Sequence, residues 1–232
     1  MKRPLIRLAL QLVASSVALV LVSTAAAELR VPQVPIAGTT LQDYLTFVGQ
    51  DIEVLSQQEV TQSWPVVEGR RVVCTLHHRD SPNASQINIG IYDPTVGAGS
   101  GYLVLFGFEG PSCYAMFRFE NGALVIDRFD PNGSFIGGTG FVGVDWTSFS
   151  LLVQTPQGLL YTQDARNSGG VAQALVYAGT APHAQAGWVA WEESERASGS
   201  DDDFEEVVLL LDTVNATPVH RTSWGGLKAR FR

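Results

Sequence analysis

The chain has 232 residues, of which 45% are hydrophobic and 16% are charged, and its formal net charge is −8. This composition is too apolar for a disordered chain, and the length fits one domain rather than several. The negative charge argues against nucleic-acid binding, because phosphate recognition needs a basic surface that releases counterions.

The first 27 residues have the layout of a secretory signal peptide. A basic start at residues 2–7 precedes an apolar run at 8–22, and three alanines at 25–27 provide small residues for cleavage. We therefore expect a secreted, periplasmic or cell-surface protein with no transmembrane anchor after cleavage. The alternative is an uncleaved anchor, because residues 8–27 are just long enough to span a bilayer.

Between an extended leader at residues 28–38 and a basic tail at 217–232, residues 39–216 are expected to form one domain. Thr39 or Thr40 is expected to cap a short helix that ends at Gly49. Its apolar residues recur at helical spacing: Leu41, Tyr44, Leu45 and Val48.

From residue 71 onward the hydrophobic residues recur with a period of two, which is typical of β-strands. Turn sequences such as Asn121-Gly122 separate the apolar runs. Short strands joined by turns predict an all-β fold, an antiparallel β-sandwich or jelly roll with one short N-terminal helix. The expected strands are residues 71–77, 86–92, 102–108, 114–119, 123–129, 149–154, 159–162, 173–177, 187–191 and 204–212.

The two cysteines, Cys74 and Cys113, leave two interpretations open. In an exported protein an even pair fits a disulfide bond, which here would close a long loop. Two buried free thiols are the alternative, because cysteine packs well as a small hydrophobic residue.

The sequence contains no recognisable catalytic motif. The glycine-rich stretch at residues 97–101 is not followed by the Lys-Ser/Thr pair of a phosphate-binding loop. His77 and His78 are neighbours in an expected strand, so we expect their side chains on opposite faces and not on one metal. We therefore expect a protein that is not an enzyme.

One segment, residues 192–212, holds nine acidic residues and a single base, Arg196. Two apolar stretches flank its polar loop, and an antiparallel hairpin would bring the carboxylates at both ends of the loop together. Hard cations such as Ca²⁺ take six to eight oxygen ligands, which such a cluster can supply. The spacing is not that of an EF-hand, because Glu206 stands where that loop needs glycine. A solvated acidic loop that keeps the protein soluble is the alternative.

The same segment resembles the signature of a bacterial exported family, the domain of unknown function 4114. Its members carry an aromatic residue before paired acids, then a glycine-rich loop, then Asp-x-Asp-Phe/Tyr-Asn-Asp before an apolar strand. Trp191-Glu192-Glu193 and residues 201–208 take these positions, and weaker similarities extend over residues 41–213. The chain departs from the pattern at Glu193 and at Glu205-Glu206, where the family has shorter side chains. The resemblance implies a β-rich, exported or surface-associated module that is associated with calcium and has no established enzymatic activity.

With the resemblance added, we expect a Ca²⁺ site in this hairpin. Asp201 and Asp203 are the first candidate ligands, followed by Glu192, Glu193, Glu205 and Glu206. If the segment is extended, one of the last two must face away from the ion. The expected function is a non-enzymatic module with a structural or adhesive role at the cell envelope, bound to an envelope or extracellular partner that the sequence does not identify.

Two other functions compete with this expectation. A carbohydrate-binding module is compatible with the five tryptophans, although Trp188 and Trp191 are expected on opposite faces of a strand and so not on one stacking platform. Its partner would be a glycan. A hydrolase would use Glu192 or Glu193 with another carboxylate, as glycosidases do.

Overall fold

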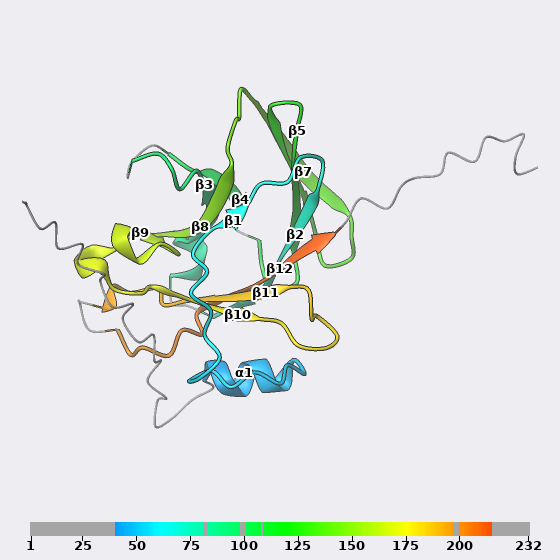
Figure 1. The fold of residues 1–232 in the computed structure, drawn as a ribbon. Helices are drawn as coiled ribbons and strands as arrows, with labels where there is room; N and C mark the ends of the chain where they lie inside the picture. The colour runs from blue at the N-terminus through cyan, green and yellow to red at the C-terminus, as the bar shows by residue number, and fades with distance from the viewer. Residues whose placement is uncertain (1–39, 81–82, 98–100, 108, 197–199, 215–232) are drawn as a thin grey trace, which may run out of the picture.

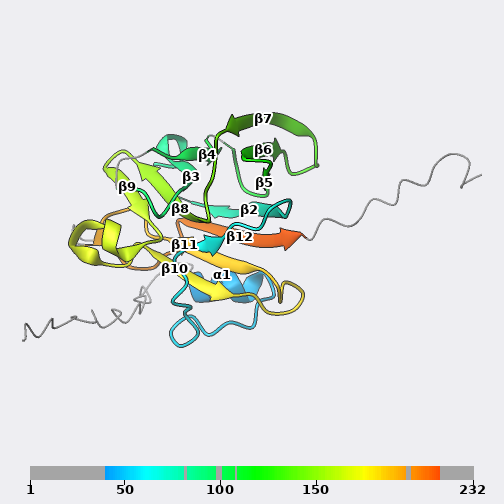
Figure 2. The ribbon, with the colours of Figure 1, turned by 45° about the horizontal axis from the view of Figure 1, so that its top comes forward.

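Figure 1 shows the computed structural model, which describes residues 40–80, 83–97, 101–107, 109–196 and 200–214. Two antiparallel sheets pack against each other, and one short α-helix covers part of the outer surface of the larger sheet (Figures 1 and 2). The expected all-β sandwich is confirmed. The predicted signal peptide, the leader and the basic tail lie outside the described residues. Within those residues, no helix has the length and apolar character that a membrane span needs.

The larger sheet has seven strands in the order β10-β11-β12-β2-β5-β6-β7. In β2, β5 and β6, buried residues alternate with partly exposed ones, because only one face of each strand meets the core. The strands of this sheet are β2 (Arg71–Arg79), β5 (Tyr114–Glu120), β6 (Ala123–Phe129), β7 (Phe135–Val142), β10 (Ala174–Ala178), β11 (Gly187–Trp191) and β12 (Val207–Val214).

The smaller sheet has five strands in the order β1-β8-β3-β4, with β9 also paired to β8. The main core lies between the two sheets, where Phe117 of the larger sheet meets Phe149 of the smaller one edge-on, with ring centroids 5.2 Å apart. The strands are β1 (Trp64–Pro65), β3 (Asn88–Tyr92), β4 (Leu103–Phe106), β8 (Ser148–Thr155) and β9 (Gly158–Tyr161), and 3₁₀ turns lie at Ala84–Gln86, Asp164–Arg166 and Ser168–Gly170.

The helix α1 (Leu41–Phe47) begins and ends where the sequence predicts. The Thr40 hydroxyl accepts a hydrogen bond from the Asp43 N–H at 3.2 Å, and Gly49 ends the helix with a φ of +79°. Its apolar side joins a second core on the outer face of β10, β11 and β12. These strands are therefore buried on both faces, which explains the continuous apolar run of β12.

Some strand boundaries differ from the prediction, and β1 and β7 were not predicted. The strand expected at residues 204–212 starts only at Val207, because Asp202 and Phe204 have φ values of +60° and +57°, which lie outside the β region. Strand β7 contains three glycines, and Gly143 follows directly after it. The strand therefore lacks the alternation of hydrophobic and polar residues that predicts the other strands.

The prediction that His77 and His78 face opposite ways is wrong. Between β12 and β2 the register shifts, so that Val208 pairs with His78 while Leu209 pairs with Leu76. His77 is the extra residue of this β-bulge, and both rings lie on the helix side of the sheet. The His78 ring lies 4.9 Å from that of Tyr44, and the His77 ring lies 4.7 Å from that of Trp188.

Cys74 and Cys113 are both buried and both free. The structure therefore agrees with the second of the two interpretations, in which they pack as small hydrophobic residues.

Candidate metal centre

The acidic hairpin brings four carboxylates to one point. Strands β11 and β12 are antiparallel, and Trp191 pairs with Val207. Glu192 directly follows β11 and Glu206 directly precedes β12, so the pairing of the strands places these two glutamates next to each other. One carboxylate oxygen from each of four residues lies within 4.8 Å of the other three: Glu192, Asp201, Asp203 and Glu206.

The other two predicted ligands, Glu193 and Glu205, are not in this group of four. Glu193 lies beside the loop that follows β2, where the Asn83 side-chain amide is 3.5 Å from its carboxylate. Glu193 directly follows Glu192 in the sequence, and Glu205 directly precedes Glu206. Of Glu205 and Glu206, only Glu206 belongs to the group, and the segment before it is not extended, because Asp202 and Phe204 have positive φ values.

The group reaches from the interior to the surface, because Glu192 and Asp203 are buried, Glu206 is half-buried and Asp201 is exposed. Glu192 is only 1% exposed. Among the described residues, neither Glu192 oxygen has a hydrogen-bond partner, and the same holds for Oε2 of Glu206. Two ionised carboxylates only accept hydrogen bonds, so they cannot satisfy each other unless one of them holds a proton. Buried carboxylates without donors are costly, and a proton or a cation is needed to offset that cost.

The ionisation of these groups follows from the same geometry. Burial is the main cause that raises the pKa of Glu192 to about 7, and the charges of Asp201 and Asp203 add to it. Burial also raises the pKa of Glu206 to about 10, with the facing charge of Glu192 as the next cause. Burial and then the Asp201 charge raise the pKa of Asp203 in the same way, after partial compensation by backbone N–H groups.

Arg196 separates Asp202 from the other aspartates. Its guanidinium donates two hydrogen bonds to the Asp202 carboxylate, one of them 2.9 Å long, and lies 5.4 Å from the centre of the Phe204 ring. The hydrogen bond from Arg196 is the largest cause that lowers the pKa of Asp202. Asp202 is therefore neutralised within the loop, and Asp201 and Asp203 on either side of it join the group of four.

Gln173, just before β10, fixes the start of the loop. Its carbonyl accepts from the Glu192 N–H at 3.1 Å, its side-chain oxygen accepts from the Arg196 N–H at 2.9 Å, and its amide donates to the Ser194 carbonyl at 2.8 Å. Gln173 is not among the predicted site residues, and nothing in its sequence neighbourhood marks it. Arg196 could have been found, because it is the single base of the acidic segment.

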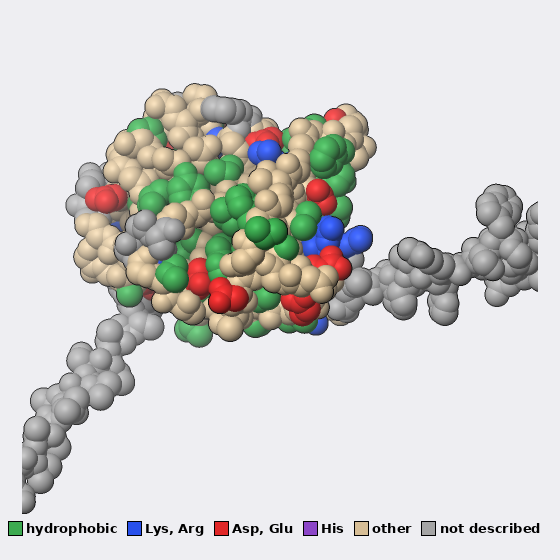
Figure 3. All heavy atoms as spheres, turned by 90° about the horizontal axis from the view of Figure 1, so that it is seen from above, with side chains coloured by type: hydrophobic (Ala, Val, Ile, Leu, Met, Phe, Trp, Pro, Cys, Tyr) green, Lys and Arg blue, Asp and Glu red, His purple; other side chains and the backbone are tan. Residues whose placement is uncertain are grey.

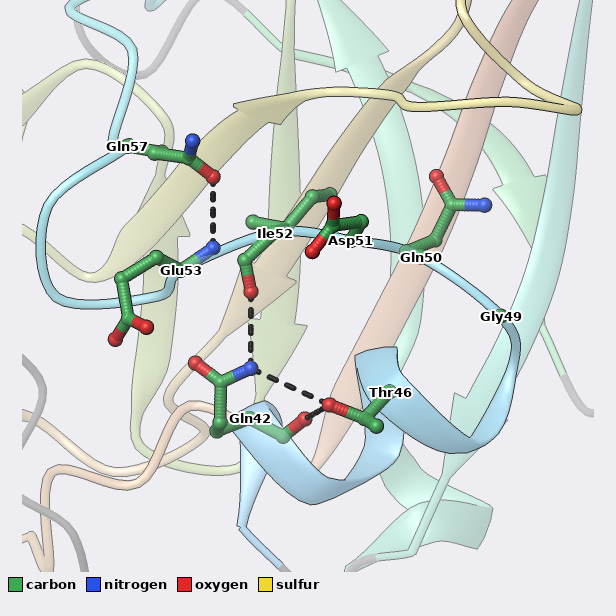
Figure 4. Close-up of a pocket in the computed structure, with 8 residues that line it drawn as sticks. All are labelled: Gln42, Thr46, Gly49, Gln50, Asp51, Ile52, Glu53 and Gln57. Atoms are coloured by element: carbon green, nitrogen blue, oxygen red, sulfur yellow. Dashed lines mark hydrogen bonds between the residues drawn. The ribbon is translucent and has the colours of Figure 1, made fainter.

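Two other parts of the fold offer no comparable arrangement of binding groups. Trp188 and Trp191 are fully buried in different cores, which confirms that they lie on opposite faces of β11 and leaves neither available for stacking on a sugar. An open hollow of about 400 Å³ lies between α1 and residues 49–57. Figure 4 shows that several of its polar groups bond to one another: the Gln42 amide donates to the Ile52 carbonyl, and the Gln57 side chain accepts from the Glu53 N–H.

Comparison with known proteins does not assign the chain to a family. No protein-family model matches the chain, and no curated protein matches it. The resemblance to the domain of unknown function 4114 therefore stays a prediction that rests on the residues quoted for it.

Proposed function

We propose that this protein is an exported, non-enzymatic β-sandwich module whose acidic hairpin binds Ca²⁺, with a structural or adhesive role at the cell envelope. The observation that carries the proposal is Glu192. Its carboxylate is buried without a hydrogen-bond donor among the described residues, and three further carboxylates meet it within 4.8 Å.

The spacing of the oxygens suits Ca²⁺. Ca²⁺ binds oxygens at about 2.3–2.6 Å, so two oxygens on opposite sides of the ion are about 4.6–5.2 Å apart. The four oxygens, all within 4.8 Å of one another, fit into a shell of that size. Four carboxylates also have enough oxygens for the high coordination number of Ca²⁺, whereas Mg²⁺ needs a tighter octahedron and keeps several waters.

The consequence of binding would be to join the two ends of the hairpin. Without a cation, burial and the facing Glu192 raise the pKa of Glu206 to about 10, so Glu206 keeps a proton at the point where the ends of β11 and β12 meet. A cation that displaces this proton would bind both carboxylates and stabilise the folded state by mass action. An extracellular module needs an affinity of only about 10⁻⁴ to 10⁻³ M for this purpose.

Thermal unfolding of the purified protein in EDTA, in Ca²⁺ and in matched Mg²⁺ tests the proposal. At a Ca²⁺ concentration of about 100 Kd, binding adds roughly 2.7 kcal/mol. For a domain of this size that corresponds to a rise in Tm of about 5–10 °C. We expect this rise in Ca²⁺ and a much smaller one in Mg²⁺. Identical curves in all three conditions would refute the Ca²⁺ site and mean that protons, and not a cation, offset the burial of these carboxylates.

Two single substitutions locate the site. Glu192→Gln keeps the side-chain shape and removes one buried charge, so it should leave the Tm in EDTA unchanged or higher and abolish the rise in Ca²⁺. Glu205→Gln removes a charge from the same segment but from outside the group of four, and it should keep most of the rise. An equal rise in wild type and Glu192→Gln would refute the assignment.

Export is tested separately. Mass spectrometry of the protein recovered from outside the cytoplasm should give a chain that begins at Glu28. A chain that still carries residues 1–27 would support the membrane-anchor alternative and leave the Ca²⁺ proposal untouched.

A further inference from the structure

The strand β7 forms a long open edge of the larger sheet. In the part of the chain that the structure describes, β7 pairs with β6 and with no other strand. An edge strand presents a row of backbone N–H and C=O groups that another strand can bind. The strand is eight residues long, whereas β1 and β4, at the ends of the smaller sheet, have two and four residues.

Charged side chains and proline, which usually protect an edge strand, are absent from β7, and a single bulge at Ile136 interrupts its register near the start of the strand. Residues 132–144 contain no charged residue and no proline. Nearly all of β7 is exposed, including Phe135, Ile136 and Val142, of which Val142 is 90% exposed. Its glycines leave the backbone uncovered by side chains, so a second strand could approach closely.

The opposite edge of the same sheet is protected by the chain itself. Gln58 forms a β-bridge with Tyr177 of β10, and the Glu59 N–H donates to the Val176 carbonyl at 2.7 Å. The segment before β1 thus occupies the edge of β10, while the described residues leave β7 without such a cover.

We propose that β7 is the interface of a homodimer, in which two copies of the chain pair their β7 strands antiparallel across a two-fold axis. The sequence Phe-Ile-Gly-Gly-Thr-Gly-Phe-Val is close to a palindrome in its hydrophobic and small residues. A two-fold axis perpendicular to the sheet keeps each face on its own side, so it must pass through a residue. An axis through Gly140 lies in the regular part of β7, beyond the bulge, and places Thr139 opposite Phe141 of the other copy. The same axis places Gly138 opposite Val142. This register pairs an aromatic residue with a β-branched one, a combination that stabilises cross-strand pairs.

The distribution of charge favours a second copy over a charged partner. The charged side chains of the adjacent strand are already paired, Asp127 with Arg118 and Arg128 with Glu109, at 3.5 Å in both cases. In Figure 3, most of the Lys and Arg side chains lie beside Asp or Glu rather than in a field of one sign. The acidic hairpin lies at the other end of the molecule from β7 (Figures 1 and 2), so two copies that meet at β7 keep their acidic ends apart.

A two-fold pairing of this kind closes on itself. Each copy contributes its β7 edge once, so association stops at the dimer instead of forming a fibre. An interface made mainly of one strand from each copy is small, and we expect a weak dimer that dissociates on dilution.

Sedimentation velocity over a range of protein concentrations tests the proposal. The wild-type protein should shift from monomer to dimer as the concentration rises. Thr139→Lys places a charge near the centre of the paired strands. Val142→Lys places a charge at the end of β7, where the wild-type side chain is 90% exposed and does not contribute to the core. Both variants should stay monomeric. Phe47→Lys, at an equally exposed apolar position on α1, is the matched control and should dimerise like wild type.

Hydrogen exchange of the β7 amides gives the second measurement. Their protection should increase with protein concentration in wild type and in Phe47→Lys, but not in Val142→Lys. A protein that is monomeric at every concentration, or a dimer that survives both lysine substitutions, would overturn the proposal. Protection of β7 that does not change with concentration would also overturn it, because the edge would then be covered within a single chain.

Discussion

The seven-stranded sheet has two unlike halves. The half formed by β10, β11 and β12 is covered on both faces, by the smaller sheet on one side and by α1 with residues 52–54 on the other. The half formed by β5, β6 and β7 has only its inner face covered and ends in an open edge. Both halves have the same antiparallel pairing, so the difference lies in what surrounds the strands.

This difference determines what chemistry each half can perform. Where a second layer excludes water, ionisable groups such as Glu192 have strongly shifted pKa values, and they can bind a cation that offsets the cost of burial. Where the layer is missing, side chains stay in solvent, and the backbone of β7 provides the binding groups. The proposed Ca²⁺ site belongs to the covered half and the proposed dimer interface to the open one.

The largest contrast is expected from removing an aromatic residue in each half. Trp188 is fully buried beneath α1, and its indole N–H donates to the Gln50 side chain at 3.0 Å. Trp188→Ala should cost about 3–5 kcal/mol of unfolding free energy. Phe135→Ala, at a position that is 61% exposed, should cost less than about 1 kcal/mol. Chemical denaturation measures both, and similar losses would show that the second layer adds little stability.

A smaller effect is expected from the arginine that holds the acidic loop. Arg196→Met keeps much of the packing on Phe204 but frees the charge of Asp202 and the conformation of the loop. We expect Ca²⁺ to bind about tenfold more weakly, which is about 1.4 kcal/mol. Arg128→Met breaks an ion pair of the open half and should leave the affinity unchanged. Calorimetric titration measures both, and equal affinities of Arg196→Met and wild type would show that Arg196 does not position the ligands.

A pH dependence is expected from His77 in the covered half. Burial, and then the charge of His183, lowers the pKa of His77. The folded state therefore binds the proton less readily than the unfolded state, so stability is lost as the pH falls below the unfolded value of about 6.5. The difference in unfolding free energy between His77→Phe and wild type should grow in favour of the variant as the pH falls from 7. A difference that is constant with pH would mean that His77 does not resist protonation.

The sequence predicts the covered half well, because its residues carry strong and consistent signals. The run of apolar residues in β12 marks a strand buried on both faces, and the acids on either side of the 194–200 loop predict that their carboxylates meet. The pairing of Trp191 with Val207 then selects Glu192 and Glu206 over their neighbours. Spacing alone does not give that selection, because the positive φ values of Asp202 and Phe204 change which side chains face inward.

The sequence predicts the open half less well, for a physical reason. Glycines give no hydrophobic period, so β7 has no signal of its own and is held in place by pairing with β6. The bulge that turns His77 and His78 to the same face depends on the register between β12 and β2, which are more than a hundred residues apart. Features set by pairing between distant strands are not visible in local patterns.

The smallest effects concern these glycines and test whether contact with β6 shapes the open edge. Gly140 has no atom near the position of an added Cβ, and its φ is not positive. Gly140→Ala should therefore raise the unfolding free energy by about 0.4–1 kcal/mol, because the unfolded chain loses conformational freedom. A Cβ at Gly138 would lie 2.9 Å from Asp127 Oδ1 and 3.2 Å from the Ile126 carbonyl oxygen, so Gly138→Ala should lower stability instead.

Chemical denaturation at low protein concentration, where association does not contribute, measures both alanine variants. Opposite signs would show that the Asp127 side chain and the β6 backbone occupy the space that Gly138 leaves, and that part of the glycine content of β7 is required by packing on β6. Equal gains in the two variants would show that chain entropy alone decides the outcome. The edge would then tolerate side chains on its outer face, and the close approach of a second strand would not depend on Gly138.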